Sequence, residues 1–320
     1  DCTRAIDKPP HVFMPIPVPA PCPPRDARPQ KLSVTAIEKW MNNPYRIYAE
    51  RILKLRPLSA IDEDVTHAER GSFVHEILGD FVKDYAGELP LNARDILLSK
   101  GQQKFAELES IAPHWHYWWP RFVRIVDWFL NQESNWRKGA VPWIVEKEGQ
   151  FCVYQSTTTG RNFHVTAKAD RIDRLREGGA FIIDYKTGVP PSWNKVSNGL
   201  APQLPLEGVI ARAGGWGEKV EVAGFAYWRI SGSFGGAGEV KTPSARSLDF
   251  TDVMDAAAIG LENLVLKFED PQTPYMAMPL TTRAYDDDKA YAHLARTAEW
   301  ASESFSAEDE DAAEEGEDGA

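Results

Sequence analysis

Cysteine is scarce in this chain of 320 residues, which contains three: Cys2, Cys22 and Cys152. Their number and spacing exclude a disulfide framework and a zinc ribbon, and they favour a cytoplasmic compartment. No run of eighteen apolar residues occurs, so we expect no segment to span a membrane. The start has no charged-then-apolar signal pattern, and because it begins with Asp1 rather than Met we expect a piece of a longer protein.

A phosphate-binding loop of the form G-x-x-x-x-G-K-[ST] is also missing from this sequence, so any ATP-driven translocation must come from elsewhere. Apolar residues are plentiful, at 43% with eleven tryptophans, which is enough for a substantial core. The net charge of −11 at first argues against a nucleic-acid partner. Residues 303–320 hold nine acids and no base, however, so the rest of the chain has a net charge of −2 and is compatible with a local basic groove.

The two ends differ in composition from the middle. Residues 1–30 contain nine prolines and predict an extended, polyproline-like linker that acts as a spacer rather than as a docking ligand. Residues 301–320 predict an acidic disordered tail. Between them, residues 31–300 predict one ordered domain, with a helical subdomain over 31–140 and a sheet with helices over 141–300.

The first half of the ordered region has helical periodicity. Residues 67–85 predict a helix with an apolar stripe, and His75 lies beside that stripe. A lone histidine in such a place is more often structural than a ligand. Residues 115–136 carry five of the tryptophans, with Arg121 and Arg124 interleaved. That pattern allows stacking on single-stranded bases, but packing in the core is the preferred interpretation.

Residues 165–188 predict two strands joined by a turn at Gly178-Gly179. Because strand side chains alternate between faces, Asp184 and Lys186 share one face, and Asp170 lies on the neighbouring strand. Two carboxylates can hold a hard cation such as Mg²⁺, and a lysine beside them can assist an attacking water or stabilise a phosphate. An ordinary cross-strand salt bridge is the alternative.

Other acids nearby are less specific. Glu146 and Glu148 lie in the preceding predicted strand, where a supporting role in the site and simple solvent exposure explain them equally well. Asp173, three residues after Asp170, cannot share a strand face with it. We expect Asp173 to pair with Arg171 or Arg174, or with nothing.

The order of His75, Asp170, the DYKTG segment and Gln203 resembles the PD-(D/E)xK nucleases of the RecB type. The segments ADRIDR, FIIDYKTG and PQLPLEG are similar to the carboxy-terminal nuclease region of the bacterial AddB family, over roughly residues 32–295. The resemblance implies an α/β, restriction-endonuclease-like fold. In that fold a central mixed sheet is flanked by helices, and a helical amino-terminal subdomain precedes the sheet.

The resemblance also implies a role for each site residue. His75, Asp170, Asp184 and the main-chain carbonyl of Tyr185 would bind Mg²⁺, with Mn²⁺ as a substitute. Lys186 would assist the attacking water, and Gln203 would position the DNA strand. One departure concerns the position four residues after Gln203, where the family has tyrosine and this chain has Glu207; its role stays open.

A second departure concerns metal clusters. Many AddB-type nucleases hold an iron–sulfur cluster on one early and three late cysteines. This chain has Asn43 at the early position and no cysteine after Pro271, so we expect no such cluster. We expect hydrophobic and aromatic packing to replace it, and the candidate residues are Tyr275, Met276, Met278 and Trp300.

The function that the resemblance implies is Mg²⁺-dependent exonuclease or endonuclease activity on DNA. The chain would be a module of an AddAB-type helicase-nuclease that processes double-strand breaks for recombinational repair in the bacterial cytoplasm, with an AddA-type helicase-nuclease and DNA as partners. Two alternatives are a stand-alone nuclease of the CRISPR-adaptation or restriction type, and a non-catalytic scaffold that binds DNA.

Overall fold

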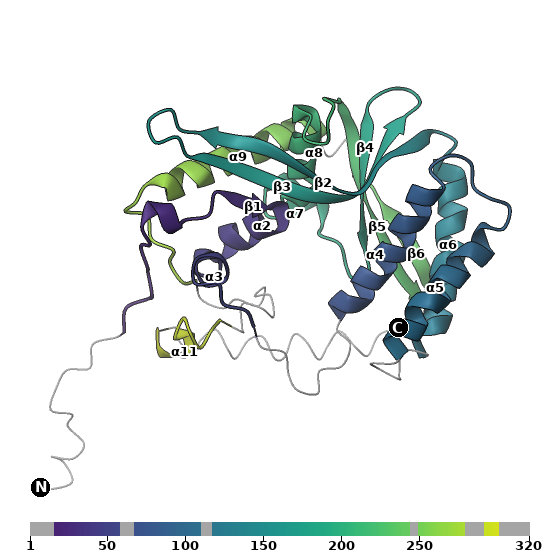
Figure 1. Ribbon diagram of the computed structural model, residues 1–320, viewed down its shortest axis with the longest axis horizontal. Coiled ribbons are helices and arrows are strands. Elements are labelled where there is room, and N and C mark those ends of the chain that lie inside the picture. The colour runs from purple at the N-terminus through teal and green to yellow at the C-terminus, as the bar shows by residue number, and fades with distance from the viewer. Residues whose placement is uncertain (1–15, 58–66, 110–116, 244–248, 279–290, 301–320) are drawn as a thin grey trace, which may run out of the picture. The chain divides into compact units, whose positions relative to one another are not determined.

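A computed structural model describes residues 16–57, 67–109, 117–243, 249–278 and 291–300 (Figure 1). The chain forms two compact units. The first, which we call the sheet unit, contains Gln30–Glu38 and Ser59–Leu266. The second, the terminal unit, contains Asp1–Pro29, Lys39–Leu58 and Lys267–Ala320. The predicted boundary near residue 140 is not one of the divisions between these units, and the predicted acidic tail lies outside the described residues.

The sheet unit is built on a mixed sheet with six strands in its described part. Their order is β1-β3-β4-β5-β6, and β2 also pairs with β3. The β3–β4 and β5–β6 pairs are antiparallel, whereas β4–β5 and β1–β3 are parallel. This mixed sheet flanked by helices confirms the predicted fold class. The strand bounds are β1 Lys31–Ser33, β2 Ala140–Gln155, β3 Asn162–Leu175, β4 Ala180–Lys186, β5 Val222–Ser233 and β6 Gly236–Lys241.

The hairpin between β3 and β4 follows the predicted turn chemistry. Gly178 and Gly179 have φ values of +106° and +82°, which residues with a side chain rarely adopt. After β4 the chain crosses over through two helices, α7 (Trp193–Ser197) and α8 (Gln203–Ala213), and then enters β5 parallel to β4. This crossover places α8 over the face of β4 that carries Ile182, since the backbone of Gly208 in α8 lies close to the Ile182 side chain.

Three helices supply a large apolar core on the opposite face of the sheet: α4 (His67–Asp84), α5 (Ala93–Glu109) and α6 (Trp119–Trp136). The bounds of α4 confirm the helix predicted over residues 67–85. The core includes Tyr185 of β4 and Trp228 of β5, which are fully buried. Four tryptophans of the aromatic segment pack against this core, as predicted: Trp118, Trp119, Trp128 and Trp136. Trp115 lies outside the described residues.

Helix α9 (Phe250–Glu269) begins in the sheet unit, where Phe250 packs edge-on against Phe225 of β5. Met254 of α9 contacts Gly208 of α8, and Arg212 of α8 forms an ion pair with Asp255. The described helices contain no segment that is long and apolar enough to cross a membrane.

The terminal unit contains short helices, and the proline-rich segment is packed among them. The main-chain N–H groups of Tyr275 and Ala277 donate to the carbonyls of Pro21 and Pro19, at 2.8 and 2.9 Å. The buried guanidinium of Arg28 donates to the main-chain carbonyls of Pro23, Phe268, Asp270, Pro271 and Thr273, at 2.6–3.1 Å. Residues 16–29 are therefore part of a folded unit rather than a free spacer, because Arg28 satisfies the carbonyls at the end of α9. The helices are η1 Arg25–Ala27, α2 Val34–Asn42 (which begins in the sheet unit), α3 Pro44–Ile47, η2 Tyr48–Ile52 and α11 Thr297–Trp300.

Aromatic side chains hold the terminal unit together. The ring centroids of Trp40 and Tyr275 each lie 4.7 Å from that of Phe268. Trp300 packs against a second small cluster formed by Tyr45, Ala277 and Ala295. The prediction for Tyr275 and Trp300 is therefore confirmed. It is wrong for Met276 and Met278, which are each 43% exposed.

Candidate active site

The candidate site lies where the β3–β4 ladder opens. Arg171 pairs with Ile183, and Asp170 and Asp184 come next on the two strands. The main-chain N–H of Tyr185 donates to Oδ2 of Asp170, at 2.9 Å, instead of to a carbonyl of β3. The side chain of Asp170 thus replaces a ladder hydrogen bond. The divergence of the strands leaves room for groups from other elements to approach the two carboxylates.

Helix α4 brings His75 to this opening. Its Nδ1 lies 3.4 Å from Oδ2 of Asp170, and its ring packs edge-on against Tyr185 with centroids 5.8 Å apart. Glu146 of β2 approaches the same place. His75, Glu146 and Asp170 each offer one ligand atom, and these atoms lie within 4.8 Å of one another. The set combines one imidazole nitrogen with two carboxylate oxygens, which suits a divalent cation such as Mg²⁺ or Mn²⁺.

Two backbone features admit Glu146 to the cluster. Glu146 has a φ of +49° within a strand, a conformation that non-glycine residues rarely adopt and that concentrates at functional sites. Its neighbours Val145 and Lys147 pair with Arg171 and Ala169, which places Glu146 across from Asp170. On α4, Gly79 lies four residues after His75, and a Cβ there would come within 2.6 Å of Cγ of Glu146. Gly79 therefore leaves the space that the Glu146 side chain fills.

The hydrogen-bond partners of the two carboxylate oxygens of Glu146 show whether a cation would fit at this site. Oε2 forms an ion pair with Lys168. Oε1 is buried and has no hydrogen-bond partner among the described residues. A buried acceptor without a partner costs free energy, and a bound cation would remove that cost. The donor set therefore fits the divalent metal that the sequence predicts.

The second part of the site joins β4 to α8. Nζ of Lys186 lies 2.8 Å from Oδ2 of Asp184 and donates to Oε1 of Gln203 at 3.1 Å. Nε2 of Gln203 donates to Oδ1 of Asp184, at 2.5 Å. The three side chains form a closed ring of hydrogen bonds, so the salt bridge between Asp184 and Lys186 exists. The predicted roles of both residues, of Gln203 and of the Tyr185 carbonyl stay predictions.

Burial and neighbouring charges shift the pKa values of the site residues in opposite directions. Burial raises the pKa of Asp184 to about 6, although Lys186 acts in the opposite direction. Burial lowers the pKa of His75, but its hydrogen bond to Asp170 and the negative charges of Asp170 and Asp184 together outweigh this, and the net pKa is raised. The same contact and a hydrogen bond from the Tyr185 main chain lower the pKa of Asp170, despite its burial.

Glu207 lies one helical turn after Gln203 and is 1% exposed. Its Oε1 accepts a hydrogen bond from Nε2 of Gln203, at 3.2 Å. Burial and the nearby charge of Asp184 raise the pKa of Glu207 well above its usual range, which favours its neutral form. A neutral carboxyl has one O–H donor and an acceptor oxygen, like the hydroxyl of the tyrosine that the family resemblance implies here. Glu207 thus holds the amide of Gln203 from the side opposite Lys186.

Behind the site, the other face of the sheet carries a buried polar network. Arg171 donates to both oxygens of Asp173, each at 2.7 Å, and also pairs with Glu133 of α6. Trp136 of α6 donates to Asp173 at 2.7 Å, and Arg171 also reaches the hydroxyl of Tyr185, at 3.4 Å. The predicted pairing of Asp173 with Arg171 is confirmed. The network fixes β3 and β4 against α6, and it anchors Tyr185 between Asp184 and Lys186.

Sequence reasoning missed two parts of this arrangement. Glu146 could not be told from Glu148, because both lie in one strand two residues apart; the structure leaves Glu148 exposed. Gly79 gave no signal, because a helical glycine is meaningful only when the neighbouring side chain is known. The positive φ of Glu146 depends on tertiary packing and leaves no trace in the residue type.

Comparison with known families decides the class of this site. The model of the PD-(D/E)XK nuclease superfamily matches residues 31–313. The chain belongs to that superfamily. Asp170, Asp184 and Lys186 lie within the matched residues, together with His75 and Gln203, so the superfamily match covers every predicted site residue.

Relatives of this PD-(D/E)XK chain fall into two groups. An uncharacterized protein of Rickettsia bellii is 30% identical over 190 residues, which are 59% of this chain and 22% of that protein. A subunit of the ATP-dependent helicase/deoxyribonuclease of Clostridium perfringens is 27% identical over 195 residues, covering 54% of this chain and 17% of its own. The corresponding protein of Streptococcus agalactiae is 26% identical over 182 residues, which are 55% of this chain and 16% of that protein. This chain thus spans about a fifth of the length of these relatives.

Among solved structures, "Crystal structure of SSO0001" aligns with a TM-score of 0.28 and 16% identity, over 72% of this chain and 76% of that one. A likeness at this level carries no argument about function.

Proposed function

We propose that this PD-(D/E)XK chain hydrolyses phosphodiester bonds in DNA with Mg²⁺, or with Mn²⁺ in its place. The observation that carries the proposal is the approach of His75, Glu146 and Asp170 within 4.8 Å, beside the ring of Asp184, Lys186 and Gln203. A metal site next to a half-buried lysine joins the two groups that phosphodiester hydrolysis needs, one to hold the phosphate and one to act on the water.

In this proposal His75, Asp170, Asp184 and the main-chain carbonyl of Tyr185 hold the metal, and Glu146 adds a further oxygen. Bound there, the cation would polarise the phosphate and lower the pKa of a water. Lys186 is charged, because Asp184 raises its pKa despite its burial, so it stabilises negative charge on the phosphate or orients the water. Gln203 fixes Lys186 through its carbonyl, and in this proposal it also positions the DNA strand.

We further propose that the chain is the nuclease module of an AddAB-type helicase-nuclease, acting on double-strand breaks for recombinational repair in the bacterial cytoplasm. Its support is the likeness to the helicase/deoxyribonuclease proteins of Clostridium perfringens and Streptococcus agalactiae, of which the aligned part is about a sixth. An AddA-type helicase-nuclease would be the partner. The alternatives are a stand-alone nuclease and a non-catalytic scaffold. Cleavage by the purified chain separates the scaffold from the enzymes, and co-purification with an AddA-type protein separates the module from the stand-alone nuclease.

Lys186→Ala tests the proposal most directly. An ammonium cannot ligate a metal, so we expect this variant to bind Mg²⁺ and DNA about normally. Single-turnover cleavage of linear DNA should fall by about a hundredfold or more, which corresponds to ~3 kcal/mol of transition-state stabilisation. Calorimetric Mg²⁺ titration and cleavage are measured on one preparation, with a chelator control for the wild type.

Two outcomes contradict this expectation. If Lys186 were only the partner of Asp184, its replacement would lower the melting temperature and leave the turnover of the folded protein unchanged. If the wild-type chain cleaved equally well with the chelator present, the metal-dependent mechanism would be wrong.

Gly79→Ala tests the part played by Glu146 without removing a ligand. The added methyl group would lie 2.6 Å from Cγ of Glu146 and would push that side chain away from Asp170. We expect a Mg²⁺ affinity at least several-fold lower, measured by calorimetry. Gly260→Ala is the matched control, because Gly260 is also a helical glycine, in α9, and a Cβ there meets nothing within 4 Å. Equal Mg²⁺ affinity in both variants would exclude Glu146 from the metal site.

A further inference from the structure

Strand β5 continues beyond the end of β4, and it leads away from the candidate site. Asp184 pairs with Tyr227, and Lys186, the last residue of β4, pairs with Arg229. Paired residues of parallel strands share a face, so Arg229 lies on the same face as Lys186. Ser231 and Ser233 follow at alternate positions of β5, which ends at Ser233. The face that carries the site therefore extends along β5 to the turn before β6.

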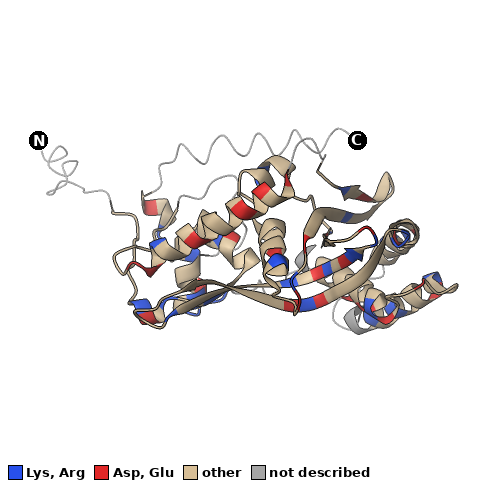
Figure 2. Cartoon of the chain, turned by 90° about the horizontal axis from the view of Figure 1, so that it is seen from above, with Lys and Arg blue, Asp and Glu red and all other residues tan. Residues whose placement is uncertain are grey.

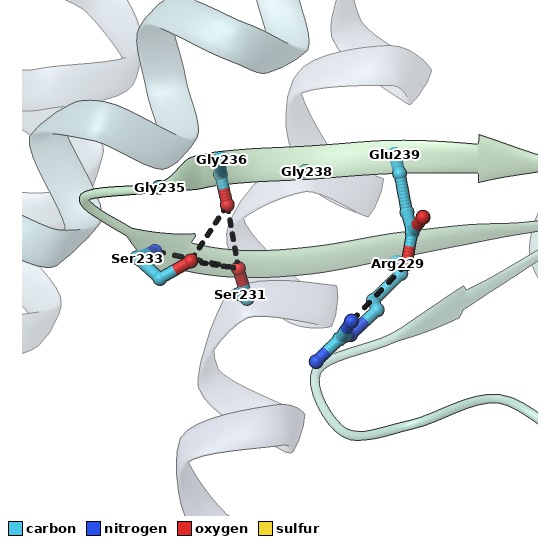
Figure 3. Close-up of a pocket in the computed structure, with 7 residues that line it drawn as sticks. All are labelled: Arg229, Ser231, Ser233, Gly235, Gly236, Gly238 and Glu239. Atoms are coloured by element: carbon cyan, nitrogen blue, oxygen red, sulfur yellow. Dashed lines mark hydrogen bonds and ion pairs between the residues drawn. The ribbon is translucent and has the colours of Figure 1, made fainter. Parts of the chain in front are cut away.

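A polar pocket of about 340 Å³ lies along this extension (Figure 3). At the turn, the hydroxyls of Ser231 and Ser233 both donate to the carbonyl of Gly236, at 2.9 and 2.7 Å. Farther from the turn, Arg229 and Glu239 face each other in Figure 3 across the hairpin. Gly235 and Gly236 leave the backbone exposed at the turn, whereas Gly238 packs against Trp128. The lining residues are Arg229, Ser231, Ser233, Gly235, Gly236, Gly238 and Glu239.

Within the pocket Arg229 is paired with Glu239, and a second base, Lys241, lies beside the lining residues. Arg229 and Lys241 both contact one carboxylate, that of Glu239, at 3.1 and 3.2 Å. Two cations against one acid leave one positive charge uncompensated within the group. The side chain of Arg229 is 35% exposed, and its guanidinium has more N–H donors than its pair with Glu239 uses. Elsewhere in the described chain, Figure 2 shows acidic and basic residues interspersed on helices and strands.

An exposed aromatic ring stands at the end of the same hairpin. Phe234 is 92% exposed. The guanidinium of Arg124 in α6 lies 4.0 Å from its ring centroid, and Nε of Arg124 donates to the carbonyl of Gly232 at 2.8 Å. A large apolar ring held in water beside a cation is the arrangement on which nucleic-acid bases stack.

We propose that the β5–β6 hairpin binds the single-stranded DNA next to the bond that is cut. A backbone phosphate lies at Arg229 and the polar pocket, and an unpaired base stacks on Phe234. The order of groups supports this: Lys186 ends β4, Arg229 lies beside it on β5, the two hydroxyls follow on β5, and the ring of Phe234 comes at the turn, next to Arg124 of α6. The identity of the ligand as DNA rests on the proposed function, whereas the surface itself rests on these contacts.

Binding of a fluorescent single-stranded oligonucleotide to the full chain, with a chelator present to prevent cleavage, tests the phosphate contact. Arg229→Ala should weaken binding by roughly five- to tenfold and reduce the slope of log affinity against log salt by about 1. Arg212→Ala is the matched control. Its side chain is 39% exposed against 35% for Arg229, and each arginine has one carboxylate partner. The control should bind like the wild type with an unchanged salt slope.

Phe234→Ala tests the stacking. We expect single-strand binding to weaken by about tenfold, with binding of a blunt duplex of the same sequence unaltered. Leu91→Ala, at a fully exposed apolar residue, is the control and should change neither. Circular dichroism confirms folding of every variant.

The outcomes separate the two proposals. If Arg229→Ala and Phe234→Ala bind like their controls while the wild type cleaves DNA, the hairpin surface is refuted and the nuclease function stands. If both variants lose binding but the wild type shows no metal-dependent cleavage, the surface stands and the catalytic proposal fails. An equal loss of duplex binding in Phe234→Ala would refute base stacking.

Discussion

Asp184→Asn is expected to abolish DNA cleavage and to make the metal-free protein more stable at pH 8. The first effect follows because the variant loses an anionic group that the site needs for charge neutralisation; we expect a fall of about a hundredfold or more, or ~3 kcal/mol. The second follows from linkage. The pKa of Asp184 is raised to about 6 in the folded chain by burial, above the 3.8 of an exposed aspartate.

The direction of the stability change with pH is set by that difference. Between about pH 4 and pH 6 the folded protein keeps a proton on Asp184 that the unfolded chain has lost, so stability falls as the pH rises. Above pH 6 the ionised carboxylate costs up to roughly 3 kcal/mol, and asparagine, which is always neutral, avoids that cost. Thermal melting at pH 5 and pH 8 should show a gain for Asp184→Asn at both pH values, and the gain should be roughly twice as large at pH 8.

Added Mg²⁺ provides the control. It should raise the melting temperature of the wild type through binding to the folded state, and raise that of Asp184→Asn much less. Near-normal Mg²⁺-dependent cleavage by Asp184→Asn would remove this residue from the site. A stability gain that is equal at both pH values would show that the cost of Asp184 is not one of charge.

Asp170→Asn is expected to lose activity and Asp173→Asn is expected to lose stability, although the two residues are three apart on one strand. Asp170→Asn should lose cleavage by at least a hundredfold with little change in melting temperature, since this carboxylate serves His75 and the proposed metal. Asp173→Asn should still cleave DNA at temperatures where it is folded. Its stability should fall by about 3–5 kcal/mol, because the buried Arg171 loses one of its two charged partners and keeps only Glu133.

Chemical denaturation and single-turnover cleavage on the same preparations distinguish the two variants. A conservative Arg171→Lys variant is a useful companion. Lysine cannot form the bidentate pair with Asp173, so it should lower stability in the same way as Asp173→Asn. If Asp173→Asn lost activity at full stability and Asp170→Asn kept it, the metal would have been assigned to the wrong carboxylate.

Several parts of this protein were determined by the sequence alone. The alternation of Val165, Ala167 and Ala169 with polar residues and the pair Gly178-Gly179 specify the hairpin, and the period of two puts Asp184 and Lys186 on one face. The same period separates Asp170 from Asp173, whose pairing with Arg171 was predicted and is confirmed. These features depend on local geometry, which residue types and their spacing describe well.

Only the tertiary structure determined the features that depend on contacts between segments far apart in the sequence. Residues 16–29 are rich in proline, which predicts extended backbone; whether that backbone is free or packed depended on Arg28 and the carbonyls beyond α9. Met276 and Met278 are as apolar as their buried neighbours, and only the packing of the terminal unit left them exposed. Glu146 joined the site because Gly79, on a helix 67 residues earlier in the chain, leaves room for it, and because its own backbone takes an unusual φ. A strand pattern states which face a side chain occupies, but which distant group meets it there is set by the packing of the whole unit.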